Sequence, residues 1–171
     1  MQKYQIFKKT LVLCTFIFVC NQATSSSATN SHSSENIQLS ALSAKWKCTE
    51  EMDYMGYAAK SEIVSEFKPN GQYFEKNQMT FIKDNEKAIA YTQSEAQWSL
   101  QEHILTIDQN KLLKFEMDNA RVEEQLNLKS ALADPDAVKL LIKKLDNKEM
   151  IANFILFDTE IENLSRVCVR Q

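Results

Sequence analysis

Apolar and polar residues alternate along much of the chain from residue 44 onward, a pattern typical of β-strands that bury one face. The alternation is most regular between residues 59 and 67, where the opposite face is mostly charged. The face that we expect to point into a core carries Ala59, Ser61, Ile63, Ser65 and Phe67.

A tight turn follows this strand at Pro69-Asn70-Gly71. Asn-Gly is favoured in short hairpin turns because both residue types adopt positive φ at low cost. Residues 72–82 then continue as a partner strand. The sequence therefore predicts a β-hairpin over residues 59–82.

Further alternating or apolar stretches follow at residues 96–101, 104–108, 113–117, 120–128, 150–157 and 164–170. Short strands at this spacing indicate an antiparallel meander. We therefore expect a mainly β domain, an antiparallel up-and-down barrel or a highly curved sheet of about 8–10 strands.

One amphipathic helix is expected over residues 134–146, before the last two strands. Asp134 is a residue type that caps helices, and Pro135 suits the first helical position. Apolar residues then recur at i, i+3, i+4 and i+7, namely Val138, Leu141, Ile142 and Leu145.

Residues 1–28 resemble an export signal: three lysines precede a mainly apolar stretch over residues 11–19, and small residues follow. That stretch is shorter than the roughly 20 residues that span a bilayer as a helix. We expect cleavage near residues 20–28, a flexible Ser-, Thr- and Asn-rich tether over residues 21–38, and one domain over residues 39–171. The protein is then periplasmic or secreted.

Loss of the signal removes three lysines and no acidic residue, so the mature chain is more acidic than the full sequence, whose net charge is −3. Nucleic acids and anionic membranes bind proteins through clustered Lys and Arg. We therefore expect no nucleic-acid partner.

The four cysteines divide by position: Cys14 and Cys20 lie in the signal, whereas Cys48 and Cys168 lie near the two ends of the domain. In an exported protein the second pair is expected to form one disulfide. Two buried free thiols are the alternative.

Cys20 allows a second interpretation of the export signal, as that of a lipoprotein. Bacterial lipoproteins carry a box of small residues before a cysteine that becomes lipidated, and a serine-rich spacer after it. Here Phe18 and Val19 are bulkier than that box, although the spacer is present. A membrane-anchored lipoprotein with Cys20 as its lipidated end is therefore the alternative to a soluble exported protein.

The domain resembles the lipocalin-like, or calycin, class of small antiparallel barrels in exported bacterial proteins. The resemblance rests on residues 45–48, 67–73, 96–100 and 166–170, and it spans most of residues 44–170. Ala44 stands where lipocalins have a glycine two places before the first-strand tryptophan. The resemblance implies a closed barrel and a site for a small apolar ligand.

The resemblance also implies how the barrel closes. In lipocalins an arginine of the last strand packs over the first-strand tryptophan, here Trp46. Alternation places Trp46 and Cys48 on one face of the first strand, and Arg166, Cys168 and Arg170 on one face of the last. We expect Arg166 or Arg170 to cover Trp46 by a cation–π contact beside the Cys48–Cys168 disulfide.

Catalytic signatures are weak. His103 is the single histidine of the domain and follows Glu102 at an expected turn, which favours an exposed turn residue over a general base or metal ligand. The acidic residues Glu50, Glu51 and Asp53 match no metal-loop spacing and are expected in a solvated loop. We expect no enzyme, metal or cofactor, with a small exported hydrolase as a remote alternative.

Aromatic residues could line an apolar cavity or fill the barrel as core. The candidate lining residues are Tyr73, Phe81, Trp98, Phe115 and Phe154. A cavity favours an exported, monomeric binding module for a small apolar ligand. A filled barrel favours a protein-interaction or structural role with an envelope protein as partner, and an exposed apolar or aromatic patch is then expected.

Overall fold

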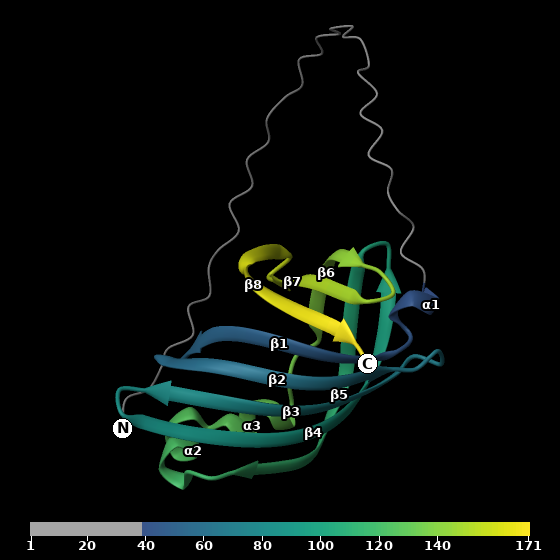
Figure 1. The fold of residues 1–171 in the computed structure, drawn as a ribbon. Helices are drawn as coiled ribbons and strands as arrows, with labels where there is room; N and C mark the ends of the chain where they lie inside the picture. Colours follow the sequence, from purple (N-terminus) through teal and green to yellow (C-terminus); the bar gives the residue numbers. More distant parts are fainter. Residues whose placement is uncertain (1–38) are drawn as a thin grey trace, which may run out of the picture. The chain divides into compact units, whose positions relative to one another are not determined.

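A computed structural model of the chain describes residues 39–171 (Figure 1). The export signal, the tether and Cys20 lie outside the described residues. Eight strands follow one another around a closed antiparallel barrel, which confirms the expected fold class. They are β1 (Lys45–Tyr54), β2 (Tyr57–Phe67), β3 (Gln72–Lys83), β4 (Glu86–Gln101), β5 (Ile104–Met117), β6 (Val138–Leu145), β7 (Glu149–Leu156) and β8 (Thr159–Arg170).

The hairpin expected over residues 59–82 is confirmed. Residues 58–67 of β2 pair in register with residues 73–82 of β3. At the turn Gly71 has φ +84°, a conformation that glycine adopts without steric cost. The inward face of β2 is the expected one, with Ile63 and Phe67 fully buried.

The helical region lies at residues 120–133, not at 134–146. Here α2 (Ala120–Leu126) and α3 (Leu128–Ala133) replace the strand expected over residues 120–128. Asn119 caps α2 by accepting the N–H of Val122 at 3.2 Å, and Val122 and Leu126 bury the same face one turn apart. Three strands follow these helices, because residues 138–145 form β6.

The helix prediction for residues 134–146 was wrong because its apolar residues satisfy two periods at once. Leu140 and Ile142 are buried, and Val138 lies at the same spacing of two on the inward face. As a strand, residues 138–145 form backbone hydrogen bonds with both β5 and β7. A helix on the outside of the barrel would leave these two strands without that partner. Tertiary pairing therefore decided the conformation.

Two of the pairings between neighbouring strands, which we call seams, are short. β5 pairs with β6 only over residues 104–107, and β1 pairs with β8 only over residues 46–49. Beyond these seams, residues 50–54 of β1 and 108–117 of β5 pair on one side only. The barrel is therefore fully closed at one end and parted at the other, where α3 packs near β5.

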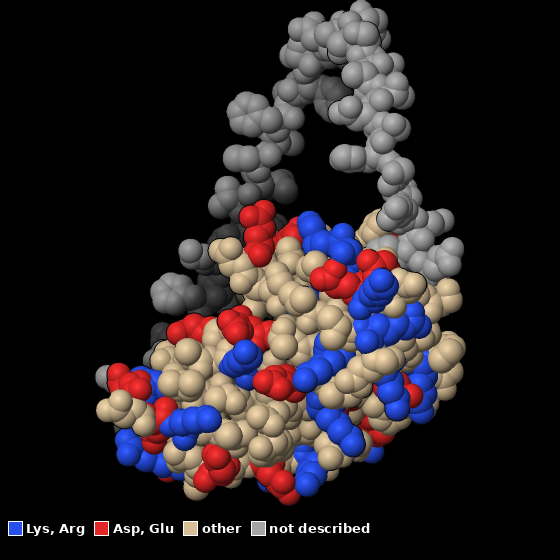
Figure 2. Space-filling view, in the orientation of Figure 1, with Lys and Arg blue, Asp and Glu red and all other residues tan. Residues whose placement is uncertain are grey.

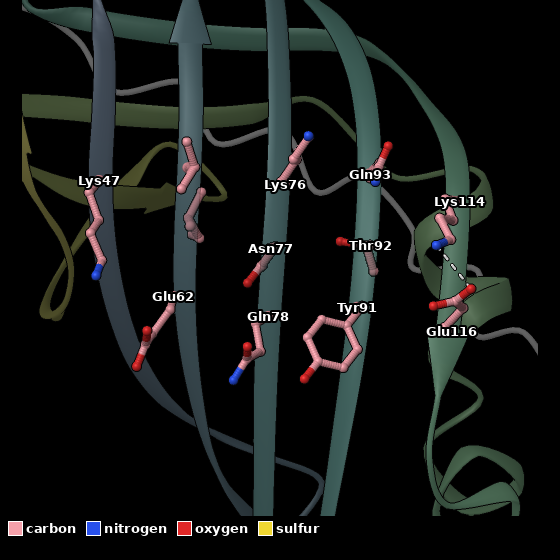
Figure 3. A pocket seen from close by; sticks show the side chains of 12 residues that line it. Lys47, Glu62, Lys76, Asn77, Gln78, Tyr91, Thr92, Gln93, Lys114 and Glu116 are labelled. Atoms are coloured by element: carbon pink, nitrogen blue, oxygen red, sulfur yellow. Dashed lines mark ion pairs between the residues drawn. The ribbon is translucent and has the colours of Figure 1, made fainter. Parts of the chain in front are cut away.

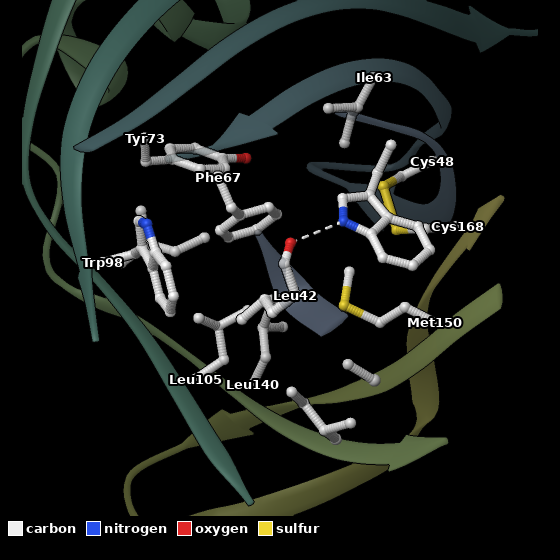
Figure 4. Close-up of a cluster of buried hydrophobic side chains, with 14 of the residues drawn as sticks. Leu42, Cys48, Ile63, Phe67, Tyr73, Trp98, Leu105, Leu140, Met150 and Cys168 are labelled. Atoms are coloured by element: carbon white, nitrogen blue, oxygen red, sulfur yellow. Dashed lines mark hydrogen bonds between the residues drawn. A yellow bond between two sulfur atoms is a disulfide. The ribbon is translucent and has the colours of Figure 1, made fainter. Parts of the chain in front are cut away.

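Two apolar clusters fill the barrel. The first lies at the closed end and includes Phe67, Trp98 and Leu105 (Figure 4). Short helix α1 (Leu39–Leu42) covers it: Leu42 is fully buried and its carbonyl accepts the Trp46 indole N–H at 3.0 Å. The second cluster packs Val122 and Leu126 of α2 against strands β2 to β4.

Charged side chains of both signs are interspersed over the outside of the strands (Figure 2). Many form exposed ion pairs, such as Lys60 with Glu51 at 3.5 Å and Lys111 with Glu95 at 3.2 Å. None of the helices described in residues 39–171 is long and apolar enough to cross a membrane.

Candidate functional site

The seam between the first and last strands carries the expected disulfide. Cys48 and Cys168 lie opposite each other in the β1–β8 register and are bonded, with Cα atoms 3.9 Å apart. Trp46 lies opposite Arg170, whose guanidinium carbon is 5.8 Å from the indole ring. Of the two arginines that the lipocalin resemblance offered, Arg170 covers Trp46.

Arg166 turns into the barrel instead. Its side chain is 7% exposed and that of Glu50 is 6% exposed, and the Arg166 Nε–H donates to a Glu50 carboxylate oxygen. Arg166 Nη1 donates to the Tyr73 hydroxyl at 3.2 Å and lies 3.6 Å from a Glu75 carboxylate oxygen. Tyr73 in turn donates its O–H to Glu75. We call Glu50, Tyr73, Glu75 and Arg166 the interior charged cluster.

The alternation of inward and outward side chains along each strand places every member of the interior charged cluster on an inward face. On β3, Tyr73 and Glu75 follow each other at a spacing of two on the inward face, and on β1 Glu50 follows Trp46 and Cys48. Arg166 precedes Cys168 by two on β8. Glu50 lies just past the last β1–β8 pair, so the cluster sits where that seam parts.

Burial and neighbouring charges fix the protonation states of Arg166 and Tyr73. Burial by itself lowers the pKa of the Arg166 guanidinium, but attraction to Glu50, and then to Glu75, outweighs burial and raises the pKa above its ordinary value. Burial raises the pKa of the Tyr73 hydroxyl well above its ordinary value, and Glu75 raises it further, against the opposing effect of Arg166. Arg166 is therefore a fixed cation, and Tyr73 is a neutral donor.

A cavity of about 120 Å³ adjoins this cluster. Its polar lining residues are Tyr73, Glu75, Asn77, Thr92, Ser94, Asn110 and Arg166. Apolar residues of β3, β5, β6 and α3 and Pro135 line the rest. The Oδ1 atom of Asn77 is buried and has no hydrogen-bond partner among residues 39–171. An unpartnered buried acceptor costs about 1–3 kcal/mol, so a bound donor at this atom is favourable.

Only one of the five aromatic residues expected to line a cavity does so. Tyr73 lines the polar cavity, whereas Trp98 and Phe154 belong to or pack against the first apolar cluster. Phe81 belongs to the second cluster and Phe115 packs against it. These four are core, because the barrel is narrow enough for its own side chains to fill most of it.

Sequence reasoning placed Glu50 wrongly. The acidic residues expected in a solvated loop lie on β1, where Glu51 and Asp53 point outward and are exposed but Glu50 points inward and is buried. Alternation from Trp46 and Cys48 through Glu50 was the available signal. Glu75 and Asn77 were missed because a polar residue on an inward face is read as a break in the pattern, not as a site.

His103 lies in the turn between β4 and β5, where its carbonyl accepts the N–H of Ile142 at 2.8 Å. Within the described residues, no group of three or more His, Cys, Asp or Glu side chains could hold a metal ion. The residues that the structure brings together are therefore the interior charged cluster and its cavity.

In comparisons with known proteins, no family model and no curated protein matches the chain. The likeness to lipocalin-like barrels therefore rests on the fold, a closed barrel of eight antiparallel strands.

Proposed function

We propose that this protein is a binding module that holds a small polar molecule with an ammonium or similar donor group in the cavity beside Arg166. The observation that carries the proposal is the charge of the interior cluster: one buried arginine faces two carboxylates, Glu50 and Glu75. Of these three residues, Glu75 and Arg166 line the cavity, and Glu50 lies behind Arg166. Such a site has an excess of negative charge and acceptors, which a cationic donor balances.

The size of the cavity limits the ligand. A volume of about 120 Å³ corresponds to roughly four water molecules at about 30 Å³ each. A fatty acid or another long apolar ligand exceeds that space. The walls carry apolar as well as polar surface, so the preference for a small polar ligand over the small apolar one expected from the lipocalin resemblance depends on the charges of Glu75 and Arg166 and on the unpartnered acceptor of Asn77.

The proposed place of action is outside the cytoplasm. The export signal expected over residues 1–28 supports this, and so does the Cys48–Cys168 disulfide, since disulfides persist in oxidising compartments. Both routes fit the proposal, a soluble mature chain and a lipoprotein anchored at Cys20. The proposed role is binding, with no catalytic step.

The proposal is tested with ethanolamine as the probe. We expect millimolar ethanolamine to raise the melting temperature of the mature protein, because bound ligand stabilises the native state by mass action. Glu75→Gln and Asn77→Leu should abolish the shift, since the first removes a charge and the second an acceptor. Glu51→Gln is the matched control, an outward-facing position next to Glu50, and should keep the shift.

Two results would refute this function. One is an equal ethanolamine shift in Glu75→Gln and in the unmodified protein, which would place binding elsewhere. The other is stoichiometric binding of palmitate with no response to ethanolamine, which would restore the apolar ligand.

A protein-interaction role is the second candidate, and one residue favours it. Phe157 is fully exposed at the tip of the β7–β8 hairpin with φ +50°, a backbone conformation unfavourable for an aromatic residue. Leu156 beside it is half exposed. Co-purification of an envelope protein with the unmodified chain, lost in Phe157→Asn, would support this role.

A further inference from the structure

A groove of about 520 Å³ runs over the outside of the barrel, across strands β1 to β5 (Figure 3). Outward-facing side chains from all five strands β1 to β5 line it. Its floor lies at Ile63, Asn77 and Thr92, positions that alternate with the outward ones. The volume is within the range of about 300–1,000 Å³ typical of ligand sites.

Strand register arranges the lining residues in two rows that cross the sheet. The first row runs through directly paired positions, namely Lys47, Val64, Lys76, Gln93 and Lys114. The second row lies one pleat away and consists of Glu62, Gln78, Tyr91 and Glu116. A basic row therefore faces a largely acidic and amide-bearing row across the groove.

The side chains that line the groove are mostly of polar types and nearly cancel in charge, and more than half of the surface that they expose is apolar. Three lysines stand against two glutamates, and Lys114 is paired with Glu116 at 3.0 Å. Tyr91 is 46% exposed, lies opposite Gln78 of β3, and is followed two residues later on β4 by Gln93 (Figure 3). A polyanion would meet the glutamates and a polycation the lysines, so the occupant that the charges fit is uncharged. Hydroxyl groups on it would match the amide, ammonium and carboxylate groups of the lining, which include both donors and acceptors.

The dimensions favour an extended chain. Adjacent strands lie about 4.8 Å apart, so the groove is roughly 19 Å long from β1 to β5. The strand spacing is close to the length of one hexose unit in an extended oligosaccharide, so successive sugar rings can lie over successive strands. A pyranose ring also has an apolar C–H face, which an exposed aromatic ring contacts, and hydroxyl groups, which amide, ammonium and carboxylate groups bind.

We propose that this groove binds an uncharged saccharide chain laid across strands β1 to β5, with a sugar ring on Tyr91 and hydrogen bonds to Gln78, Gln93 and Lys76. The groove shares Asn77 and Thr92 with the interior cavity, but none of the four side chains proposed to contact the saccharide lines that cavity. The inference therefore does not rest on the proposed function. It adds a second ligand class to the molecule.

The test is titration of the ¹⁵N-labelled mature protein with cellohexaose, maltohexaose and chitohexaose, followed by NMR chemical shifts. At least one hexasaccharide should shift the amide signals of the two rows. Tyr91→Ala should weaken its binding about tenfold, whereas Tyr91→Phe should keep most of it because the ring remains. Tyr91 is exposed, so its replacement is expected to leave the fold intact.

Phe157→Ala is the matched control, since it removes an exposed aromatic ring outside the groove. The affinity of the Phe157→Ala variant for the hexasaccharide should equal that of the unmodified protein. The proposal is overturned if none of the three hexasaccharides shifts the signals of the rows, if the shifts map to the β7–β8 hairpin or the barrel interior, or if Tyr91→Ala binds as tightly as the unmodified protein.

Discussion

Replacing Arg166 by methionine is the most direct test of the interior charged cluster. Methionine keeps an unbranched side chain of similar length but removes the cation. Glu50 then loses the hydrogen bond and ion pair from Nε, and Tyr73 and Glu75 lose the partner at Nη1. Because Arg166 and Glu50 are both more than nine-tenths buried, solvent replaces little of this loss.

Breaking a buried ion pair by removing one partner costs about 3–5 kcal/mol. We expect Arg166→Met to lower the free energy of unfolding by that amount at pH 7, a large part of the ~5–15 kcal/mol typical of a domain.

The measurement is urea unfolding with the disulfide intact, followed by the fluorescence of Trp46 and Trp98. Adding Glu50→Gln to Arg166→Met should recover part of the lost stability, because it removes one of the two orphaned charges. A cost below about 1 kcal/mol at pH 7 would show that Arg166 and Glu50 do not form a buried ion pair that stabilises the fold.

Three further predictions concern stability. Replacing both Cys48 and Cys168 by alanine should lower the free energy of unfolding by roughly 4–5 kcal/mol on the chain-entropy model, measured by urea unfolding, since the bond closes a loop across a sequence separation of 120; a loss below ~1 kcal/mol would contradict that model. Because the pKa of Tyr73 is raised well above its ordinary value of 10.0, the stability that its neutral hydroxyl contributes is present below pH 10 and is lost as pH rises through the folded-state pKa, and Tyr73→Phe should flatten this alkaline decline in unfolding titrations. Phe157→Asn should raise the melting temperature by relieving up to about 1 kcal/mol of strain at positive φ, and an unchanged or lower value would show that the turn is not strained.

Alternation of apolar and polar residues predicted much of the fold. The period of two placed Ser61, Ile63 and Phe67 on the inward face of β2, and the Asn70-Gly71 turn set the register of the hairpin with β3. Both features are local: they depend on neighbouring residues and on the conformations that single residues allow. The disulfide was also predictable, because only two cysteines remain in the domain.

Local patterns did not decide the region between β5 and β7. Residues 120–128 fit a strand and residues 138–145 fit a helix, yet the structure reverses both assignments. The apolar positions of each segment satisfy both periods, so the side chains alone favour neither conformation. The outcome depended on which segment completed the hydrogen bonds of β5 and β7, and these are partners distant in sequence.

The sequence by itself therefore determined the faces of the regular strands, the hairpin turn and the cysteine pairing, because each follows from local geometry or simple counting. Only the tertiary structure decided that Arg170 covers Trp46 while Arg166 enters the barrel with Glu50 and Glu75. It also decided that Lys47, Lys76 and Lys114 stand in one row. Both sites bring together residues from separate strands, and strand register, which depends on the whole barrel, sets their positions.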